Sequence, residues 1–235
     1  MDDTTAVARS AISPAPPETV VAGWAVSGRR STGALTLTDV SPLAKVAVRA
    51  GVDGAMSRAL DVPFGRISRD VGALDGADAG LLVVGSGPGE WLVLGAPGAQ
   101  ATISERLGRL AERSTPGASA DSGELVTVVD LTHGRALMRL TGPAAADLLA
   151  RECAVDLTDA ACPDGSALRT AVAGLATDIV RDDRDGTPSY LLHCERSSGQ
   201  YLFDALLDAG TDLGVDVDGF TLTDPRGEPR ATAHS

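Results

Sequence analysis

The chain has 235 residues, a formal net charge of −12, 43% hydrophobic residues and only 3% aromatic residues. A chain of this size can bury a core without a disulfide or a metal, and aliphatic side chains must fill most of that core. The acidic charge repels phosphate backbones, so we expect no nucleic-acid partner. No apolar run reaches the roughly 18 residues that cross a bilayer, so we expect no membrane association.

The cysteines and the first residues favour a cytoplasmic protein. Cys153, Cys162 and Cys194 cannot all pair within one chain, and none lies in a Cys-x-x-Cys pattern. Reduced thiols are therefore expected. The sequence begins Met-Asp-Asp, without the basic and apolar segments of a secretory signal.

Residues 1–40 are predicted to form a flexible N-terminal arm. The proline-rich stretch 13–18 is incompatible with a helix or a central strand, and a run rich in Gly, Ser and Thr follows at 28–36. An arm that becomes ordered against a partner is the alternative. Ser41 followed by a proline resembles a helix start and predicts a helix over 41–60.

The remaining chain predicts two blocks, each with a hairpin followed by a helix. The first has strands at 81–84 and 91–94 and an amphipathic helix over 99–113, and a polar linker covers 114–123. The second has strands at 125–131, 135–140, 168–173, 179–180 and 189–195 and helices at 141–151 and 198–209. Hairpins mixed with helices predict the α+β class, with mixed and antiparallel sheets and packed helices.

These elements predict one domain over 41–220, and a division into halves at 41–113 and 124–220 stays open. Residues 221–235 are polar and are predicted to form a flexible tail.

The Gly-rich segment 85–89 predicts a hairpin turn. A dinucleotide-binding loop would need a helix next, whose N-terminus holds the pyrophosphate, but the following residues Trp-Leu-Val-Leu favour a strand. His193 and Cys194 are neighbours on a predicted strand and point to opposite faces, which makes shared metal ligation improbable. His133 lies in a turn beside Asp130, where a solvated role is the commoner interpretation.

The chain contains no Gly-x-Ser-x-Gly nucleophile elbow. Asp182, Asp183 and Asp185 surround a predicted turn, and turn chemistry with solvation accounts for them. We therefore predict no catalytic, cofactor-binding or metal-binding residue in this chain, which favours a structural or binding role.

Two sets of motifs resemble known families. Val-Asp-Leu-Thr-His-Gly-Arg at 129–135 and Leu-Thr-Gly-Pro-Ala-Ala-Ala-Asp at 140–147 resemble the aminomethyltransferase (glycine-cleavage T-protein) pattern. Narrower motifs resemble the gamma subunits of sarcosine oxidase: Gly-Pro-Gly-Glu-Trp-Leu at 87–92, Cys-Ala-Val-Asp-Leu at 153–157, Thr-Pro-Ser-Tyr-Leu-Leu at 187–192 and Arg-Ser-Ser-Gly-Gln-Tyr-Leu at 196–202. The resemblance covers about 41–214.

The resemblance implies an aminomethyltransferase-like folate-binding-domain fold. It implies that the chain is a non-catalytic structural subunit of a heterotetramer with alpha, beta and delta chains, which demethylates sarcosine oxidatively to glycine in sarcosine catabolism and one-carbon metabolism. In that family the partner subunits carry NAD, tetrahydrofolate, FAD, FMN and zinc, and gamma carries none. Interface residues are then expected at Trp91, Arg135, Arg196 and Tyr201.

One departure keeps a second interpretation open. T-proteins place an Asp-Asp pair after a Gly-rich hairpin, whereas the corresponding stretch here, 174–180, retains only Asp178. The chain also ends before the further domain that completes the folate pocket in those relatives. The alternative is a free-standing tetrahydrofolate-dependent aminomethyltransferase-like enzyme, with Asp178 or Asp130 near the amine.

Overall fold

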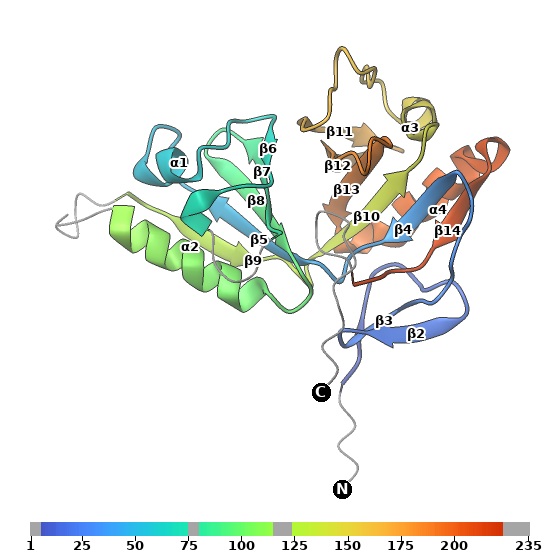
Figure 1. The fold of residues 1–235 in the computed structure, drawn as a ribbon, viewed down its shortest axis with the longest axis horizontal. Helices are drawn as coiled ribbons and strands as arrows, with labels where there is room; N and C mark the ends of the chain where they lie inside the picture. Colours follow the sequence, from blue (N-terminus) through green and yellow to red (C-terminus); the bar gives the residue numbers. More distant parts are fainter. Residues whose placement is uncertain (1–5, 75–79, 115–123, 223–235) are drawn as a thin grey trace, which may run out of the picture. The chain divides into compact units, whose positions relative to one another are not determined.

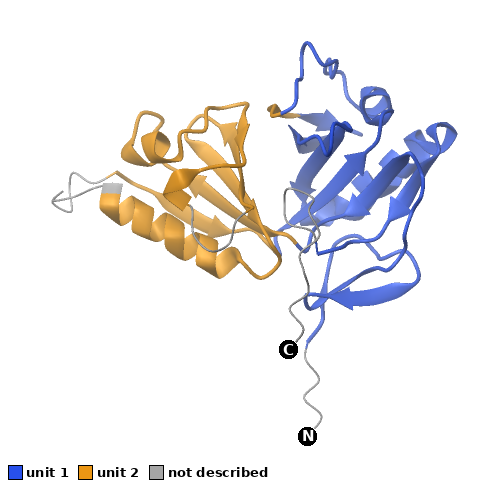
Figure 2. Ribbon diagram, in the orientation of Figure 1, with its two compact units in different colours: residues 1–42, 133–164, 170–222 blue, residues 43–132, 165–169, 223–235 orange. Residues whose placement is uncertain are grey.

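The computed structural model describes residues 6–74, 80–114 and 124–222, which divide into two compact units (Figures 1 and 2). Unit 1 combines residues 6–42, 133–164 and 170–222, and unit 2 combines 43–132 with 165–169, apart from the gaps just given. The units do not follow the predicted halves, because residues 6–42 belong to the unit that also contains the C-terminal strands and helices. The predicted tail lies almost wholly outside the described residues.

Unit 2 is built on a five-stranded antiparallel sheet in the order β6-β7-β8-β5-β9. The strands are β5 (Ala44–Arg49), β6 (Ile67–Ser68), β7 (Leu82–Gly87), β8 (Glu90–Gly95) and β9 (Thr127–Asp130). The helices are α1 (Ala55–Leu60), a short 3-10 helix (Gly72–Leu74) and α2 (Gln100–Ser114). The predicted turn between β7 and β8 is confirmed, and Gly89 adopts the positive φ of 69° that this turn requires.

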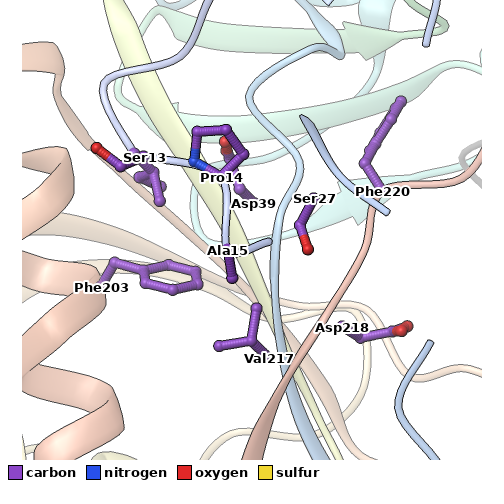
Figure 3. A pocket seen from close by; sticks show the side chains of 10 residues that line it. Ser13, Pro14, Ala15, Ser27, Asp39, Phe203, Val217, Asp218 and Phe220 are labelled. Carbon is purple, nitrogen blue, oxygen red and sulfur yellow. The ribbon is translucent and has the colours of Figure 1, made fainter. Parts of the chain in front are cut away.

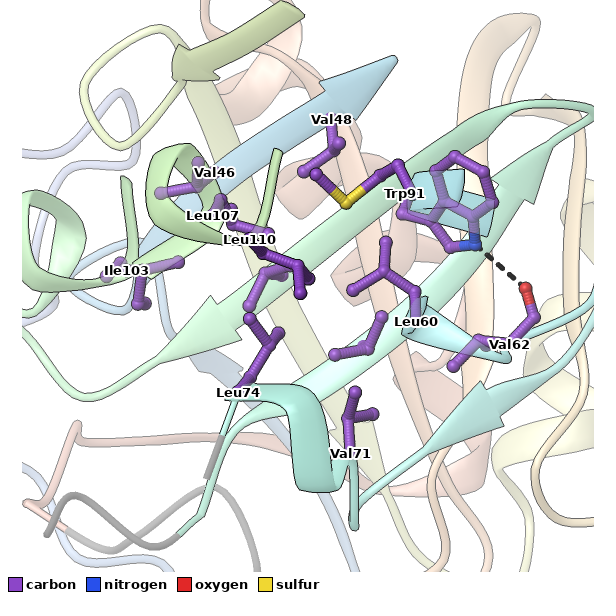
Figure 4. Close-up of a cluster of buried hydrophobic side chains, with 14 residues drawn as sticks. Val46, Val48, Leu60, Val62, Val71, Leu74, Trp91, Ile103, Leu107 and Leu110 are labelled. Atoms are coloured by element: carbon purple, nitrogen blue, oxygen red, sulfur yellow. Dashed lines mark hydrogen bonds between the residues drawn. The ribbon is translucent and has the colours of Figure 1, made fainter. Parts of the chain in front are cut away.

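The core of unit 2 is aliphatic apart from one indole (Figure 4). On α2, Ile103, Leu107 and Leu110 are buried at the helical spacing that the sequence predicts. Trp91 is 4% exposed, and its Nε1–H donates to the Val62 carbonyl at 2.8 Å. This bond satisfies the one polar group of the ring, so the side chain can lie wholly inside the core.

Unit 1 contains a six-stranded mixed sheet in the order β11-β12-β13-β10-β4-β14. The strands are β4 (Leu35–Asp39), β10 (Arg135–Thr141), β11 (Ala167–Val172), β12 (Leu175–Arg181), β13 (Ser189–Glu195) and β14 (Val215–Asp218). β14 pairs with β4 in parallel, whereas β10 pairs with β4 and β13 in antiparallel fashion. The predicted α+β class with mixed and antiparallel sheets is confirmed.

Two helices of unit 1, α3 (Ala145–Glu152) and α4 (Gly199–Ala209), pack on each other and bury leucines and an aromatic ring. Glycines permit close approach at both ends of α4. A Cβ added at Gly199 would lie 2.6 Å from the Ala136 Cβ, and one at Gly210 would lie 2.5 Å from a methyl of Leu148. In the part of the chain that the structure describes, no helix has the length and apolar character needed to span a bilayer.

The prediction of a loose arm is wrong for residues 6–40. This segment forms β1 (Ala8–Arg9), β2 (Glu18–Val21) and β3 (Trp24–Ser27), a three-stranded sheet in the order β1-β3-β2, and then contributes β4 to the large sheet. Ile12 and Trp24 are only 2% and 5% exposed. The prolines and glycines fall between short strands, so they punctuate an ordered segment.

Three contacts fix this segment to the rest of unit 1. The Trp24 ring stacks on the His133 ring, with centroids 4.7 Å apart and planes 9° apart. The Arg196 guanidinium donates to the Arg9 carbonyl at 2.7 Å, and the Ser13 amide donates to Gln200 Oε1 at 2.7 Å. His133 is exposed in a turn, as predicted, and one face of its ring also has a structural partner in Trp24.

The predicted helix over 41–60 is wrong in its first half, where β5 forms, and right only over α1. Ser41 caps no helix. Its Oγ instead accepts from the Leu137 amide at 3.0 Å and donates to the Leu137 carbonyl at 3.2 Å. The hydroxyl therefore satisfies backbone groups of β10 that a neighbouring strand would otherwise bind. The alternation of Val46 and Val48 with the charged Lys45 and Arg49 could have shown the strand, because side chains in a strand have a period of two.

The short helix α1 depends on a carboxylate from a distant part of the chain. Glu124 Oε2 accepts from the amides of Ala55 and Met56 at 2.8 and 3.1 Å, and Oε1 accepts from the Gly51 amide at 3.0 Å. A helix of six residues begins with several amides that have no internal acceptor, and this carboxylate satisfies them. A Cβ added at Gly54 would overlap it, at 1.6 Å from Oε1.

Trp24→Ala should destabilise the protein by about 3–5 kcal/mol, because it removes a buried ring and its stack on His133. Urea unfolding followed by far-UV circular dichroism measures the loss. The matched control is Val20→Ala on the neighbouring strand, where the side chain is 56% exposed and the change should stay within about 0.5 kcal/mol. Equal stabilities for the two variants would mean that the N-terminal segment is not docked.

Glu124→Gln should lower the free energy of unfolding by about 1–3 kcal/mol, because three amides lose a charged acceptor. Chemical denaturation of this variant beside Glu112→Gln, an exposed glutamate on α2, gives the comparison. Hydrogen exchange should rise at Ala55 and Met56 in the first variant alone. Unchanged exchange at these two amides would contradict the capping role.

Candidate functional site

The hairpin between β12 and β13 brings together the polar groups that the sequence places apart. Asp178 and His193 are directly paired residues on these antiparallel strands, and Asp178 Oδ2 lies 3.3 Å from His193 Nδ1. Their side chains are 13% and 4% exposed. This pair was missed because His193 was compared only with its sequence neighbour Cys194. The antiparallel register of the hairpin would have revealed it.

A buried imidazole that touches a carboxylate is held in one orientation, which is one part of a general-base arrangement. A general base also needs a substrate group within hydrogen-bonding distance of the ring. Asp130, the other carboxylate considered for the amine, belongs to unit 2, and its Oδ1 accepts from the Thr132 amide at 2.8 Å. Asp130 therefore closes a local turn.

The turn at 182–188 carries a buried ion cluster. Asp182 is 1% exposed, and its Oδ2 accepts from Arg139 at 2.7 Å and from Arg184 at 2.8 Å. Solvation does not account for this aspartate, so the interpretation of Asp182 as an ordinary turn residue is wrong. That Arg139 of β10 reaches this turn could not be predicted from the sequence, because it depends on the pairing of β10 with β13.

A second arginine on the same hairpin is engaged in a separate set of contacts. The Arg181 side chain is 5% exposed; it contacts both oxygens of Asp183 at 3.1 Å and donates to the Cys162 carbonyl at 2.6 Å. The hydrogen bonds to Asp183 raise the pKa of Arg181 above its ordinary value. Its guanidinium also lies over the Tyr190 ring, 5.7 Å from the centroid.

The three cysteines are free and buried. Burial raises the pKa of the Cys194 thiol to about 11, so it is not a thiolate at neutral pH. Among the described residues, no three His, Cys, Asp or Glu side chains come close enough together to hold a metal ion.

One small pocket lies in unit 1 between the N-terminal segment, α4 and β14 (Figure 3). Phe203 and Val217 line it beside Pro14, and the carboxylates of Asp39 and Asp218 lie at its edge. Its volume of about 20 Å³ holds a water molecule and little more. The pocket is thus too small for a folate or a flavin.

The four residues expected at an interface fall into different environments. Trp91 is buried in the core of unit 2, so the expectation fails for this side chain. Arg135 pairs with Glu195 at 2.7 Å on neighbouring strands, and Arg196 binds the backbone of the N-terminal segment. Tyr201, 59% exposed on α4, is the one of the four that presents a large apolar surface.

The fold places the chain among the aminomethyltransferase-like folds. A chain of the heterotetrameric sarcosine oxidase from Corynebacterium sp. U-96 in complex with pyrrole 2-carboxylate superposes with a TM-score of 0.61 at 22% identity, over 80% of this chain and 90% of that chain. The glycine cleavage system aminomethyltransferase T from Bartonella henselae superposes with a TM-score of 0.59 at 18% identity, over 86% of this chain and 55% of that chain. The predicted fold is therefore confirmed.

The family model of the GCVT N-terminal domain matches residues 80–224, more than half of the chain, and the chain belongs to this family. A sarcosine oxidase subunit gamma from Arthrobacter sp. is 30% identical over 146 residues, which span 62% of this chain and 66% of that relative. The resemblance to the gamma subunits, predicted from the motifs, is confirmed.

The free energy of unfolding should fall between pH 9 and 11. The thiol of an unfolded chain ionises near its ordinary pKa of 9.0, whereas Cys194 in the folded protein stays protonated to about 11. The raised folded pKa therefore adds stability that is complete below pH 9 and is lost as the pH rises to 11, by up to about 3 kcal/mol.

Urea unfolding at a series of pH values measures this loss. Cys194→Ala should flatten the profile in this window. The control Ile179→Val, another buried truncation in the same sheet, should lower stability equally at every pH. Parallel profiles for wild type and Cys194→Ala would show that this thiol does not contribute.

Proposed function

We propose that this chain is a non-catalytic structural subunit of a heterotetrameric sarcosine oxidase, which supports the oxidative demethylation of sarcosine to glycine. The observation that carries the proposal is the 30% identity to a sarcosine oxidase subunit gamma, with motifs in the same order. The fold supports it, because a chain of a heterotetrameric sarcosine oxidase matches over most of both lengths.

The contacts of three polar residues in unit 1 agree with a structural role. His133, Arg196 and Asp182 each stabilise the fold of unit 1, as a stack, a backbone clamp and a buried ion pair. In this proposal the partners are alpha, beta and delta subunits, and these carry the FAD, FMN, NAD, zinc and tetrahydrofolate. The complex would work in the cytoplasm, where the free thiols of this chain stay reduced.

A second candidate is a free-standing tetrahydrofolate-dependent aminomethyltransferase. The family match and the buried Asp178–His193 pair favour it, because a carboxylate held beside an imidazole can position an amine or a proton. Neither feature explains the gamma-type motifs, which is why this candidate ranks second.

A tagged copy of the chain, co-expressed with the genes beside its own, should co-purify with flavin-containing subunits in stoichiometric amounts. Flavin absorbance and subunit masses in the purified complex give the measurement. Tyr201→Glu should reduce the yield of complex, because it places a charge on the exposed ring of α4, and the matched control Tyr201→Phe should keep it. Recovery of the tagged chain alone, well folded, would refute the assignment.

Tetrahydrofolate added to the isolated chain separates the two candidates. The structural subunit should show no saturable change in the fluorescence of Trp24 and Trp91. Saturable binding that Asp178→Asn abolishes would instead support the aminomethyltransferase.

A further inference from the structure

Arg184 presents buried hydrogen-bond donors that nothing in the described chain accepts. Its Nη2 donates to Asp182 Oδ2 at 2.8 Å. Its Nε and Nη1 are buried and have no acceptor among the residues that the structure describes. A guanidinium carries five N–H donors in a fixed plane, so most of its hydrogen-bonding capacity is unused.

The carboxylate that holds Arg184 is shared. Asp182 Oδ2 also accepts from Arg139, and the Arg139 Nη1 donates to Ser189 Oγ at 2.8 Å. The side chains of Arg139 and Arg184 are 14% and 16% exposed. Two guanidinium groups therefore converge on one buried carboxylate oxygen, and both side chains keep a small exposed fraction.

The neighbouring acids do not supply the missing acceptor. Asp183 binds Arg181 through both of its oxygens. Asp185 is exposed in the turn at a positive φ of 50°. A buried charged donor without an acceptor is unfavourable, so an anion that reached Nε or Nη1 would be stabilised there.

We propose that the Arg139–Asp182–Arg184 cluster binds one carboxylate group at a free donor of Arg184, either Nε–H or Nη1–H, since these two donors point to different edges of the guanidinium and cannot share one carboxylate. A monoanion fits better than a phosphate dianion, because Asp182, Asp183 and Asp185 surround the arginine and the chain carries a net charge of −12. The carboxylate comes from a small free acid or from an acidic side chain of an associated subunit. The inference stands on unit 1 alone and holds whether or not the chain belongs to an oxidase.

Formate and acetate are the probes for a free carboxylate. The thermal midpoint of the isolated full-length chain should rise saturably with formate or acetate, by about 4 °C at saturation, relative to sodium chloride at equal ionic strength. Arg184→Met, which keeps the aliphatic stem, should abolish the rise. It should also lower the midpoint in chloride, because the buried Asp182 loses one of its two arginine partners, so the formate-specific rise and not the midpoint itself is the readout. A purely structural arginine would lower the midpoint in chloride when replaced, and the wild-type chain would then show no formate-specific rise.

Arg151→Met is the matched control. Arg151 pairs with Asp212 on the surface of the same unit, so its replacement should leave the formate response intact. Arg184→Lys, which keeps the charge but has no Nε donor, should reduce the response and serves if the methionine variant does not fold.

A carboxylate from a partner gives a different pattern. Co-purified wild-type complex should then show no response to formate, and Arg184→Met should lower the yield of complex while Arg151→Met does not. A wild-type chain without a formate-specific response, together with a complex indifferent to Arg184→Met, would overturn the proposal. A formate response that survives in Arg184→Met would overturn it as well.

Discussion

The pairing of β4 between β10 and β14 is the constraint on which unit 1 depends. Leu37 of β4 lies opposite Leu140 of β10 on one side and opposite Val217 of β14 on the other. Without β4, both neighbouring strands would lose their backbone partners on that side, and buried amides and carbonyls would have none. β4 is thus as much a part of this sheet as the motif-bearing strands, although it lies before the segment that carries the family resemblance.

The packing of the N-terminal segment on unit 1 also explains the contacts of two polar residues from the motifs. His133 follows a family-like turn and carries the Trp24 ring, while Arg196 opens the α4 region and holds the Arg9 carbonyl. Both residues hold the first strands in place, a packing role that requires no substrate.

Elements with strong local patterns were predictable from the sequence. The β7–β8 hairpin has a glycine-rich turn between two apolar runs, and α2 has leucines at helical spacing. The strands before residue 40 were missed because each is short. β1, β2 and β3 pair with one another, whereas β4 pairs with β10 and β14, which lie more than 90 residues away. The misreading of β5 as helix followed from Ser41 and its proline, since a capping pattern is local and the true partner of Ser41 is Leu137.

The candidate site likewise contains residues that could be predicted from the sequence and contacts that could not. Asp178 was singled out from the motif, but its contact with His193 needed the hairpin register. The cluster around Asp182 needed a third strand, β10, to supply Arg139. Trp91 was expected at an interface, because an indole suits both a subunit interface and the core of a unit, where it in fact donates to the Val62 carbonyl.

Unit 1 is formed from segments that lie far apart in the sequence, which determines how late in synthesis its sheet can be completed. β4 ends at Asp39 and β14 begins at Val215, so the edge of β4 that pairs with β14 stays open in the nascent chain until residue 215 and its neighbours have been synthesised. Unit 2 is mostly contiguous over 43–132 and can collapse earlier. Translation therefore produces a half-built intermediate with an open strand edge, the kind of species that recruits a chaperone or pairs with another chain.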